Sequence, residues 1–498
     1  MALVPEGTLM GRAAAGLAAV CGRLLGTCYG ARVVVLAGAG DNGGDALYAG
    51  TRLRSRGAKV SAVATSARLH EAGAAALRRA GGRILDAAGT GAGQVPGAGT
   101  ISGPVASAIA EADLIIDGIL GIGGHGGLRE PAASLAALVD AARRDGAVVV
   151  AVDLPSGCDA DTGVVSGAAI TADITVTFGT HKPGLLIDPG AGHAGAVELI
   201  DIGLGPHLAA AGREPDVIAL QAPDVAALLP VPGAESDKYR RGVLGVLAGS
   251  DRFTGAAVLA TGGAVRGGAG MVRLVSAAPA AEQVRRCWPE AVITVTDRRD
   301  PAAAVTAAGR VQAWVAGPGM GTGDDAVARL AAVLATAVPV LVDADGLTVL
   351  AAHRELLGTR PAGTVTLITP HAGELSRLIG KDHAYIEANR LESARRAATE
   401  LGVTVLLKGS TTVIADASGP VLVNPTGTPW LATAGSGDVL SGLTGALLAQ
   451  GVRPAASAAA AAAFLHGLAG RLAARDAPCG AADVIGALPD AFRAVTGA

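Results

Sequence analysis

The chain reads Ala434-Gly435-Ser436-Gly437-Asp438, a turn of small residues that ends in one carboxylate and runs into an apolar helix. Gly435 and Gly437 let the backbone approach a ligand, so that free N–H groups can point at an anion. A carboxylate beside a bound anion is repelled by it, so Asp438 requires a further explanation. A base that removes a proton from a substrate hydroxyl next to a bound phosphate would explain Asp438. The alternative is an ordinary helix start, in which Ser436 caps the helix and Asp438 matches its dipole.

A second glycine-rich segment follows the strand-like residues 32–36 and reads Gly38-Ala39-Gly40-Asp41-Asn42-Gly43-Gly44-Asp45. It fits the GxGxxG pattern in the context that a dinucleotide fingerprint requires, after a strand and before a helix. Such folds place a ribose-binding acid about 20 residues further on, but residues 62–67 contain none. A nicotinamide dehydrogenase is therefore disfavoured. Asn42 and Asp45 suit hydrogen bonding to a ligand or coordination of a cation, although Asp and Asn also stabilise turns by themselves.

Two further loops contain an aspartate directly after an apolar strand, Asp117 within residues 115–127 and Asp153 within residues 150–157. In a doubly wound sheet the carboxyl ends of the strands converge on the ligand crevice. Asn42, Asp117 and Ser156 offer only oxygen ligands, which suits a hard cation better than zinc. A single aspartate at a strand end is more often a cap, but matching placement in several loops favours a site.

The composition indicates an α/β protein with at least two domains. The chain has 498 residues, of which 73 are Gly, and only 2% are aromatic, which suits tight strand–helix turns. A net charge of −3 provides no basic field for nucleic acid or acidic membranes. The cysteines form no CxxC pair, as expected for reduced thiols in the cytoplasm. No signal peptide is recognised, and the alanine-rich residues 455–463 are expected to form a closely packed helix rather than a membrane span.

Proline-rich residues 205–235 predict a linker between domains 1–212 and 213–498, with a short helix around residues 224–229. On both sides strand-like runs alternate with helical segments, which predicts parallel sheets wrapped by helices. The runs before the linker are residues 32–36, 59–64, 114–117, 147–152 and 174–178. Those after it are residues 243–247, 271–275, 313–316, 338–342, 365–368 and 403–407, followed by a hairpin of strands 411–415 and 421–423.

Together these motifs resemble two known families. Residues from about 9 to 204 resemble the NAD(P)H-hydrate epimerase domain, whose loop usually reads Asn-Asn-Gly-Gly-Asp-Gly and here reads Asp41-Asn42-Gly43-Gly44-Asp45-Ala46. Residues from about 216 to the end resemble the nucleotide-dependent NAD(P)H-hydrate dehydratases, which have a ribokinase-like fold. The matching motifs are, in order, residues 237–242, 255–257, 317–321, 343–345, 369–374, 408–412 and 435–442. The fused pair is similar to the bacterial bifunctional NAD(P)H-hydrate repair enzymes.

The resemblance implies a Rossmann-like three-layer N-terminal domain and a ribokinase-like α/β/α C-terminal domain. In the N-terminal domain, Asp153 would handle the proton in the interconversion of the R and S hydrates of NADH or NADPH. K⁺ would lie with Asn42, Asp117 and Ser156. The residues expected to contact the hydrate are Asp41, Asn42, Gly43, Gly44, Asp45, Gly121, Ile122, Gly123, Gly124, His125, Gly126, Gly127 and Asp153.

In the C-terminal domain, the resemblance implies that Asp438 takes the proton from the C6 hydroxyl of the S hydrate. The hydroxyl oxygen then attacks the terminal phosphoryl of ADP, and phosphate leaves with elimination to give NAD(P)H and AMP, while Mg²⁺ neutralises the phosphate charge. The residues expected to contact the hydrate are Ala257, Gly319, His371 and Asp438, and those expected to hold the nucleotide are Lys408, Gly409, Ser410, Thr411, Thr412 and Gly437.

Ordinary structural roles remain open for several of these residues. His371 could only cap the following helix, Lys408 could be a solvated lysine, and Glu374 could be a first-turn acid that matches the helix dipole. Asp343 and Asp345 could order a strand–helix turn.

Asp41 and Ala46 depart from the epimerase pattern, and Asp41 adds a charge beside a phosphate-bearing substrate. The family normally has a further helix-bearing segment before residues 9–25, which can help this domain pair with itself, and the chain is expected to lack it. The remaining alternative is a ribokinase-like small-molecule kinase whose N-terminal domain only binds nucleotides or a partner. A homo-oligomer in the cytoplasm is expected, with no nucleic-acid or membrane partner. The preferences between ADP and ATP, and between the hydrates of NADH and NADPH, stay open.

Overall fold

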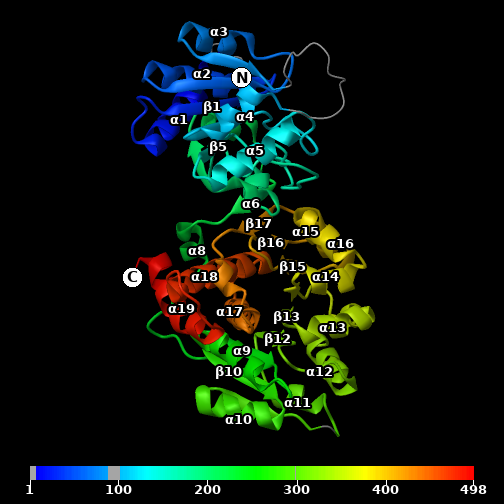
Figure 1. Ribbon diagram of the computed structural model, residues 1–498. Helices are drawn as coiled ribbons and strands as arrows, with labels where there is room; N and C mark the ends of the chain where they lie inside the picture. The colour runs from blue at the N-terminus through cyan, green and yellow to red at the C-terminus, as the bar shows by residue number, and fades with distance from the viewer. Residues whose placement is uncertain (1–6, 88–100, 213, 298, 498) are drawn as a thin grey trace. The chain divides into compact units, whose positions relative to one another are not determined.

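The computed structural model describes residues 7–87, 101–212, 214–297 and 299–497 (Figure 1). The chain forms two compact units, Met1–Glu214 and Pro215–Ala498, which we call the N-terminal and C-terminal domains. The boundary predicted from the sequence lies after residue 212.

The N-terminal domain is built on a seven-stranded sheet of strand order β3-β2-β1-β4-β5-β6-β7, in which all pairs are parallel. Its strands are β1 (Arg32–Ala37), β2 (Lys59–Ala64), β3 (Arg83–Asp86), β4 (Leu114–Gly118), β5 (Val148–Val152), β6 (Ile174–Phe178) and β7 (Ala196–Ile200). Its helices are α1 (Thr8–Leu25), α2 (Asp41–Ser55), α3 (Glu71–Arg79), α4 (Gly103–Ala110), α5 (Ala132–Arg144), η1 (Pro183–Leu185), α6 (Gly190–Ala194) and α7 (Gly205–Ala211).

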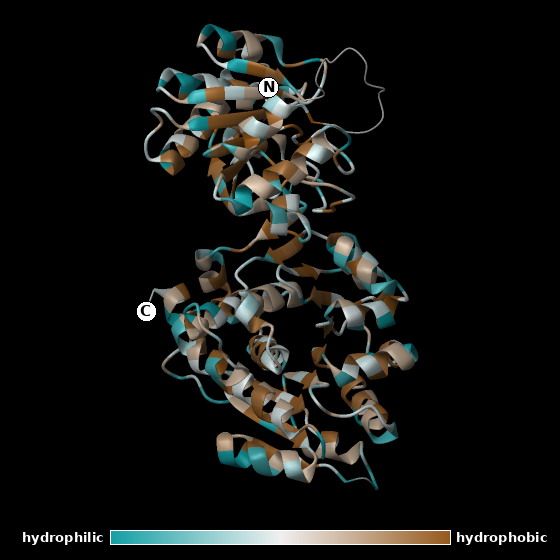
Figure 2. Ribbon diagram, in the orientation of Figure 1, coloured by the Kyte–Doolittle hydropathy of each residue, from teal (hydrophilic) through white to brown (hydrophobic). Residues whose placement is uncertain are grey.

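Alternating strand residues divide the core of this domain between the two faces of the sheet. Val33 and Val35 of β1 pack with residues of α1 and α2, including Leu47. Val34 and Leu36 point to the other face and pack with residues of α4 and α5. Because successive side chains of a strand point to opposite faces, an all-apolar strand requires helices on both sides, which is the three-layer arrangement seen in Figure 2.

Among the described residues, one helix, α1, is long and apolar enough to cross a membrane, as judged by its length and composition alone. Its residues Ala13, Leu17 and Cys21 are buried in the core beneath α2 and the sheet. A core helix passes the same test, so this packing accounts for its apolar composition.

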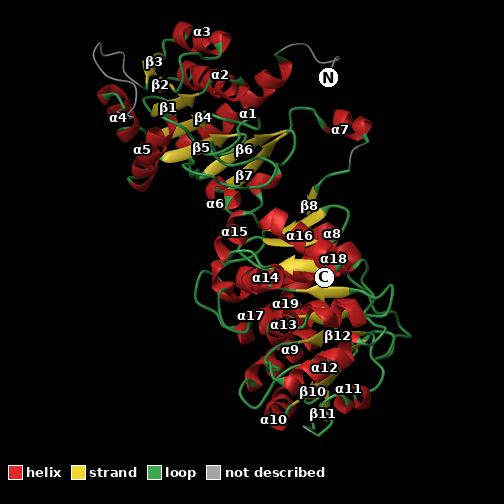
Figure 3. Cartoon of the chain, turned by 90° about the vertical axis from the view of Figure 1, so that its right-hand side faces the viewer, coloured by secondary structure: helices red, strands yellow, loops and turns green. Residues whose placement is uncertain are grey.

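The C-terminal domain contains a ten-stranded sheet of order β11-β10-β9-β12-β13-β14-β15-β16-β17-β8 (Figure 3). Its strands are β8 (Val217–Ala219), β9 (Val243–Leu247), β10 (Met271–Ser276), β11 (Val292–Val295), β12 (Ala313–Ala316), β13 (Val340–Val342), β14 (Thr366–Ile368), β15 (Thr404–Leu407), β16 (Thr412–Ala415) and β17 (Val421–Asn424). Strand β16 is antiparallel to β15 and β17, and the other pairs are parallel.

Helices cover both faces of this sheet (Figures 1 and 3). They are α8 (Ala222–Leu228), α9 (Thr254–Arg266), α10 (Ala278–Cys287), α11 (Ala303–Ala307), α12 (Asp324–Leu334), α13 (Asp345–Ala352), η2 (Arg354–Thr359), α14 (Ala372–Ile379), α15 (His383–Ala388), α16 (Arg390–Leu401), η3 (Pro429–Leu431), α17 (Ser436–Ala449), α18 (Ala455–Ala474) and α19 (Ala481–Thr496). The predicted packed helix in the alanine-rich segment is confirmed, because most residues of α18 are buried in the core cluster shared with α9, α17 and α19.

The predicted strands are present in both domains, but the predicted linker is wrong in part. The short helix within it is present as α8. The preceding residues Val217–Ala219 form β8, which pairs in parallel with β17 and completes one edge of the C-terminal sheet. Prolines on either side of this strand obscured it, because Pro215 and Pro223 flank a run of only three strand residues.

Glycines bring α17 into backbone contact with α9. A Cβ atom on Gly442 would lie 2.0 Å from the carbonyl oxygen of Ala260, and one on Gly263 would lie 2.3 Å from that of Val439. The two helices therefore pack with no side chain between them at these points. Helix α17 begins at the Asp438 turn, so this contact positions that turn over the sheet.

We expect Gly442→Ala to destabilise the protein by about 1–3 kcal/mol, because the added methyl group must push α17 away from α9. The measurement is the urea midpoint of the full chain, followed by circular dichroism. Gly486→Ala on α19 is the matched control: no atom lies within 4 Å of its Cβ position, and the higher helix propensity of alanine should stabilise it by up to about 1 kcal/mol. Equal midpoints for Gly442→Ala and the wild type would contradict the packing argument.

Candidate active sites

The Asp438 turn leaves the start of α17 open to a ligand. Gly435 precedes the helix with a φ of 85° and makes no side-chain cap hydrogen bond. The Ser436 hydroxyl instead donates to the carbonyl of Leu431 at 2.7 Å, so the interpretation of Ser436 as the N-cap is wrong. In the part of the chain that the structure describes, α17 thus begins without a side-chain cap, as an anion-binding helix start requires.

Asp343 connects this turn to the nucleotide-binding residues that the sequence predicts. It is buried directly after β13, where Oδ1 accepts from Lys408 Nζ at 2.8 Å and Oδ2 accepts from the Ser441 hydroxyl at 2.6 Å. A Cβ atom on Gly437 would lie 3.5 Å from Lys408 Nζ. The structure thus brings Lys408, Gly437 and Asp438 together, and Lys408 is a paired, largely buried lysine rather than a solvated one.

Carboxylates outnumber cations at this point. Burial raises the pKa of Asp438 to about 7, and the charge of Asp343 adds to the shift while Lys408 opposes it. Burial by itself lowers the pKa of Lys408, but the carboxylates of Asp343 and Glu374 outweigh burial, so that its pKa is raised. Lys408 therefore stays charged, while Asp438 exchanges its proton near neutral pH.

His371 caps α14, as the structural alternative predicts. The ring atom Nδ1 of His371 accepts from the backbone N–H of Gly373 at 3.0 Å, and the backbone N–H of His371 donates to the Glu374 carboxylate at 2.8 Å. The side chain is still 57% exposed, so capping leaves part of the ring available to a ligand. Glu374 likewise serves the helix start and lies 3.8 Å from Lys408 Nζ.

The remaining predicted residues of this domain lie at neighbouring loops. Asp345 accepts from the N–H of Gly321 at 2.9 Å, which joins the loop of Gly319 to the turn after β13. A Cβ atom on Gly319 would lie 2.8 Å from that of Ala256 on α9. Ala257 of α9 is fully buried in the core, with neither its side chain nor its backbone exposed, so the structure does not support its predicted contact with the hydrate.

Arg390 is a buried residue that contacts the backbone of the predicted nucleotide loop. It is not predicted from the sequence. The loop between β15 and β16 contains Lys408, Gly409, Ser410 and Thr411, and the fifth predicted residue, Thr412, begins β16. The buried guanidinium donates to the carbonyl of Lys408 at 2.7 Å and pairs with Glu387 at 2.7 Å. A Cβ atom on Gly409 would lie 2.2 Å from it, so glycine is required beside this arginine.

In the N-terminal domain the three predicted cation ligands converge. The Ser156 hydroxyl and N–H donate to the buried carboxylate of Asp117 at 2.6 and 2.8 Å. Asn42 donates to the carbonyl of Leu120 at 2.9 Å, and Leu120 N–H donates to the Ser156 hydroxyl at 2.9 Å. Burial raises the pKa of Asp117 to about 6, against the hydrogen bonds from Ser156 and Ile119.

The predicted loop 41–45 is the first turn of α2. Gly43 and Gly44 are buried there: a Cβ atom on Gly43 would meet the carbonyl of Gly38 at 2.2 Å, and one on Gly44 would meet the His70 ring at 2.9 Å. These two glycines therefore allow close packing of the helix start and do not face open space. Asp41 is exposed, and its side chain can reach a ligand.

The second predicted loop, which comprises Gly121, Ile122, Gly123, Gly124, His125, Gly126 and Gly127, starts next to α2. A Cβ atom on Gly121 would lie 3.1 Å from Asn42 Oδ1, and one on Gly127 would lie 2.8 Å from the backbone of Gly167. Between these fixed ends, Ile122 and His125 are exposed.

Asp153 follows β5 with a positive φ of 65°. Its Oδ1 accepts from Lys182 Nζ, from the Thr177 hydroxyl at 3.1 Å and from the N–H of Phe178 at 3.1 Å. Lys182 also donates to the Thr177 hydroxyl and the Phe178 carbonyl. Lys182 is not predicted as a site residue, because its only signal in the sequence is its place after the strand next to β5.

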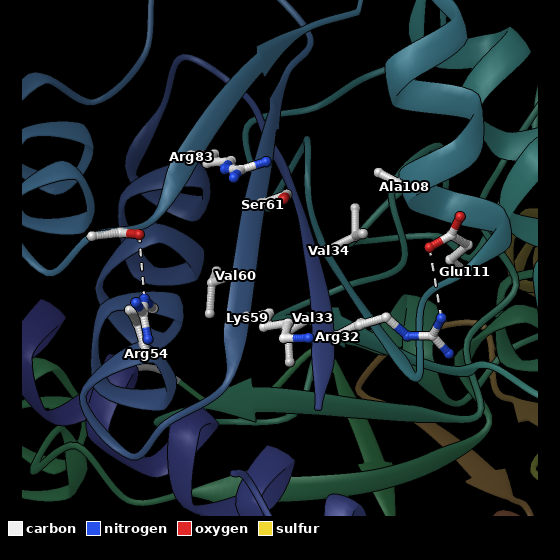
Figure 4. Close-up of a pocket in the computed structure, with 11 residues that line it drawn as sticks. Arg32, Val33, Val34, Arg54, Lys59, Val60, Ser61, Arg83, Ala108 and Glu111 are labelled. Carbon is white, nitrogen blue, oxygen red and sulfur yellow. Dashed lines mark hydrogen bonds and ion pairs between the residues drawn. The ribbon is translucent and has the colours of Figure 1, made fainter. Parts of the chain in front are cut away.

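A cavity of about 520 Å³ lies elsewhere in this domain (Figure 4). It is lined by the first residues of three neighbouring strands, Arg32, Lys59 and Arg83, at the edge of the sheet opposite to Asp117. Arg32 pairs there with Glu111 at 3.7 Å. None of the predicted site residues lines this cavity, so it is separate from the candidate sites.

Comparison with known proteins gives both halves a relative. A protein-family model described as NAD(P)H-hydrate dehydratase matches residues 244–486, and one described as YjeF-related protein N-terminus matches residues 6–184. The bifunctional NAD(P)H-hydrate repair enzyme Nnr of Mycobacterium leprae (strain TN) is 48% identical over 482 residues, which cover 96% of this chain and 91% of that protein. The enzyme of the same name from Moorella thermoacetica is 36% identical, with 89% and 83% covered.

Solved structures match the C-terminal domain. A ribokinase-like superfamily protein from Enterococcus faecalis V583 superposes with a TM-score of 0.51 at 23% identity and covers 57% of this chain and 99% of that chain. The ADP/ATP-dependent NAD(P)H-hydrate dehydratase of Bacillus subtilis, co-crystallised with ATP and Mg²⁺, gives a TM-score of 0.49 at 30% identity, with 55% and 97% covered. The predicted fold class is confirmed. By identity and coverage, the chain belongs to the bifunctional NAD(P)H-hydrate repair enzymes.

Proposed function

We propose that this protein restores hydrated nicotinamide cofactors, with a dehydratase site in the C-terminal domain and an epimerase site in the N-terminal domain. The observation that carries the proposal is the carboxylate of Asp438 on an uncapped helix start, beside the lysine that Asp343 holds. An ordinary helix start explains neither the buried lysine nor the excess of carboxylates.

In the dehydratase site, Asp438 removes the proton from the C6 hydroxyl of the S hydrate. The hydroxyl oxygen then attacks the terminal phosphoryl of ADP, which turns a poor leaving group into a phosphate and gives AMP. Elimination of that phosphate from C6, with loss of a proton from C5, restores the dihydronicotinamide. Lys408 and the free N–H groups at the start of α17 hold the nucleotide phosphates, and Gly319 and His371 border the hydrate.

The acidic surroundings of Asp438 also fit a divalent cation. The charges of Asp343, Asp345 and Glu374 each raise the pKa of Asp438, and Lys408 opposes them. A nucleotide brings more negative charge, so a hard cation with oxygen ligands is needed. Asp345 and Glu374 would hold Mg²⁺, which when bound neutralises the phosphate charge.

In the epimerase site, the hydrate would lie between the start of α2, the loop 121–127 and Asp153. K⁺ would be held by Asn42, Asp117 and Ser156. Asp117 supports this assignment because it is a buried carboxylate and pairs with no lysine or arginine among residues 7–87, 101–212, 214–297 and 299–497. A cytoplasmic location fits the free cysteines of the described chain.

Replacing the proposed base tests the dehydratase claim. We expect Asp438→Asn to reduce kcat by about 100-fold or more, which is the usual contribution of a positioned general base. The measurement is the recovery of dihydronicotinamide absorbance from hydrated NADH with Mg²⁺, K⁺ and ADP. Asp483→Asn, which changes only the exposed capping aspartate of α19, serves as the control. Recovery at the wild-type rate in Asp438→Asn would remove the dehydratase mechanism.

The pH dependence gives a second test of the same residue. A base acts when ionised, and the pKa of Asp438 is raised to about 7. The dehydratase kcat/KM should therefore fall as the pH drops below about 7, approaching tenfold per pH unit. It is measured with purified S hydrate, so that epimerisation does not contribute. A flat profile from about pH 5.5 to 8 would contradict this role.

The cation site predicts a K⁺-dependent stability. An ion that binds only the folded state raises the melting temperature of the protein, so KCl should stabilise the wild type more than choline chloride at equal ionic strength. Asp117→Asn should abolish this difference and slow R-to-S conversion, because the amide keeps the size of the side chain but removes its charge. A wild-type melting temperature that is equal in both salts would argue against bound K⁺.

A further inference from the structure

Two carboxylates of the N-terminal domain stand in opposite electrostatic situations. Asp153 Oδ1 receives three donors, among them the ammonium of Lys182, which is itself largely buried. Such donors favour the ionised form of a carboxyl group. Asp153 Oδ1 is therefore fully engaged by donors, whereas its other oxygen, Oδ2, accepts no hydrogen bond from residues 7–87, 101–212, 214–297 and 299–497.

Asp45, one helical turn into α2, has no such support. Its Oδ1 is buried and makes no hydrogen bond to any described residue. Burial raises the pKa of Asp45 to about 7, and the charges of Asp153 and Asp41 add to the shift. A buried carboxyl oxygen without a partner is costly when ionised, so the neutral acid is the form that this position stabilises.

Other charged groups around α2 are already occupied. His70 accepts from the N–H of Gly73 and so caps α3, and Arg12 of α1 donates to the carbonyl of Ile202. Lys182 is paired with Asp153. None of them pairs with Asp45 among the described contacts. Two carboxyl groups whose environments separate their protonation states are the usual arrangement for an acid and a base.

We propose that Asp45 is the general acid of the epimerase and Asp153 its base. Asp45 gives its proton to the C6 hydroxyl of the hydrate. The C6–O bond breaks, water leaves, and the lone pair of N1 forms a C6=N1 double bond. Water then adds to the opposite face of C6, and Asp153 takes the proton that it releases. Proton exchange with solvent returns both carboxyl groups to their starting forms.

This assignment rests on the proposed epimerase function and makes a prediction that the function alone does not. The C6 oxygen is lost and replaced, so R-to-S conversion in ¹⁸O-labelled water should place one ¹⁸O atom at C6 in each turnover. Conversion should also slow as the pH rises through about 7, because Asp45 must carry its proton.

The test uses the full chain with the R hydrate, and corrects for spontaneous conversion. Asp45→Asn keeps the size of the side chain but has no acidic proton, so we expect kcat for R-to-S conversion to fall about 100-fold or more with KM changed only severalfold. Asp45→Glu, which keeps the acid, should recover part of the rate. Glu71→Gln, at the exposed start of α3, should behave as the wild type.

The outcomes separate the assignment from the function. Wild-type conversion without ¹⁸O incorporation would overturn the acid role, as would an Asp45→Asn variant within threefold of the wild-type kcat. Loss of activity in Asp45→Asn together with loss of the K⁺-dependent stability would show a disturbed fold, and the wild-type pH profile and ¹⁸O content then decide. If the wild type does not convert the R hydrate at all, the epimerase function itself fails.

Discussion

In each domain a largely buried lysine pairs with a carboxylate at the carboxyl edge of the sheet, and that carboxylate acts on a second, buried carboxyl group. Lys408 binds Asp343, and Lys182 binds Asp153. The lysine stabilises the carboxylate that it touches and leaves a second one without a direct cation. Burial raises the pKa of that second group to about 7 in both domains. A group with such a pKa can both hold and release a proton at neutral pH, which is the requirement that both proposed reactions share.

Glycines and a few buried polar residues fix the positions of these charges. Gly442 and Gly263 let α17 meet α9 backbone to backbone, which places the Asp438 turn over the strand ends. Arg390 holds the carbonyl of Lys408 from beneath the loop. In the N-terminal domain, Asp117 at the end of β4 accepts a hydrogen bond from the Ser156 hydroxyl and so fixes the position of the loop that follows β5. The sites therefore depend on backbone approach and buried hydrogen bonds more than on large side chains, in agreement with an aromatic content of only 2%.

The sequence predicted the interior strands of both sheets and missed the strands at the edges. β3 and β7 border the N-terminal sheet, and β8 and β11 border the C-terminal sheet. Interior parallel strands are covered on both faces and so appear as continuous apolar runs. The edge strands are short or half-exposed, with residues such as Arg83 and Glu198, so their runs are weak.

The site could be predicted where its signal is local and not where it depends on distant partners. The Gly435–Asp438 turn is visible as a glycine pattern before an apolar helix. The roles of Asp343, Lys182 and Arg390 depend on residues that are far away in sequence, such as Ser441, 98 positions from Asp343. The alternative in which Ser436 caps the helix rested on the usual role of a hydroxyl at a helix start, whereas here that hydroxyl donates to the carbonyl of Leu431.

The pairing of β8 with β17 has a practical consequence for anyone who separates the two halves. The family model for the dehydratase matches from residue 244 onward, but the C-terminal sheet of this chain also includes residues 217–219, which form β8. A fragment cut at residue 244 would leave the backbone N–H and C=O groups of β17 unpaired along an exposed border. Such a border invites strands from other molecules, and the fragment would tend to aggregate. A C-terminal fragment of this chain should therefore begin before Asp216.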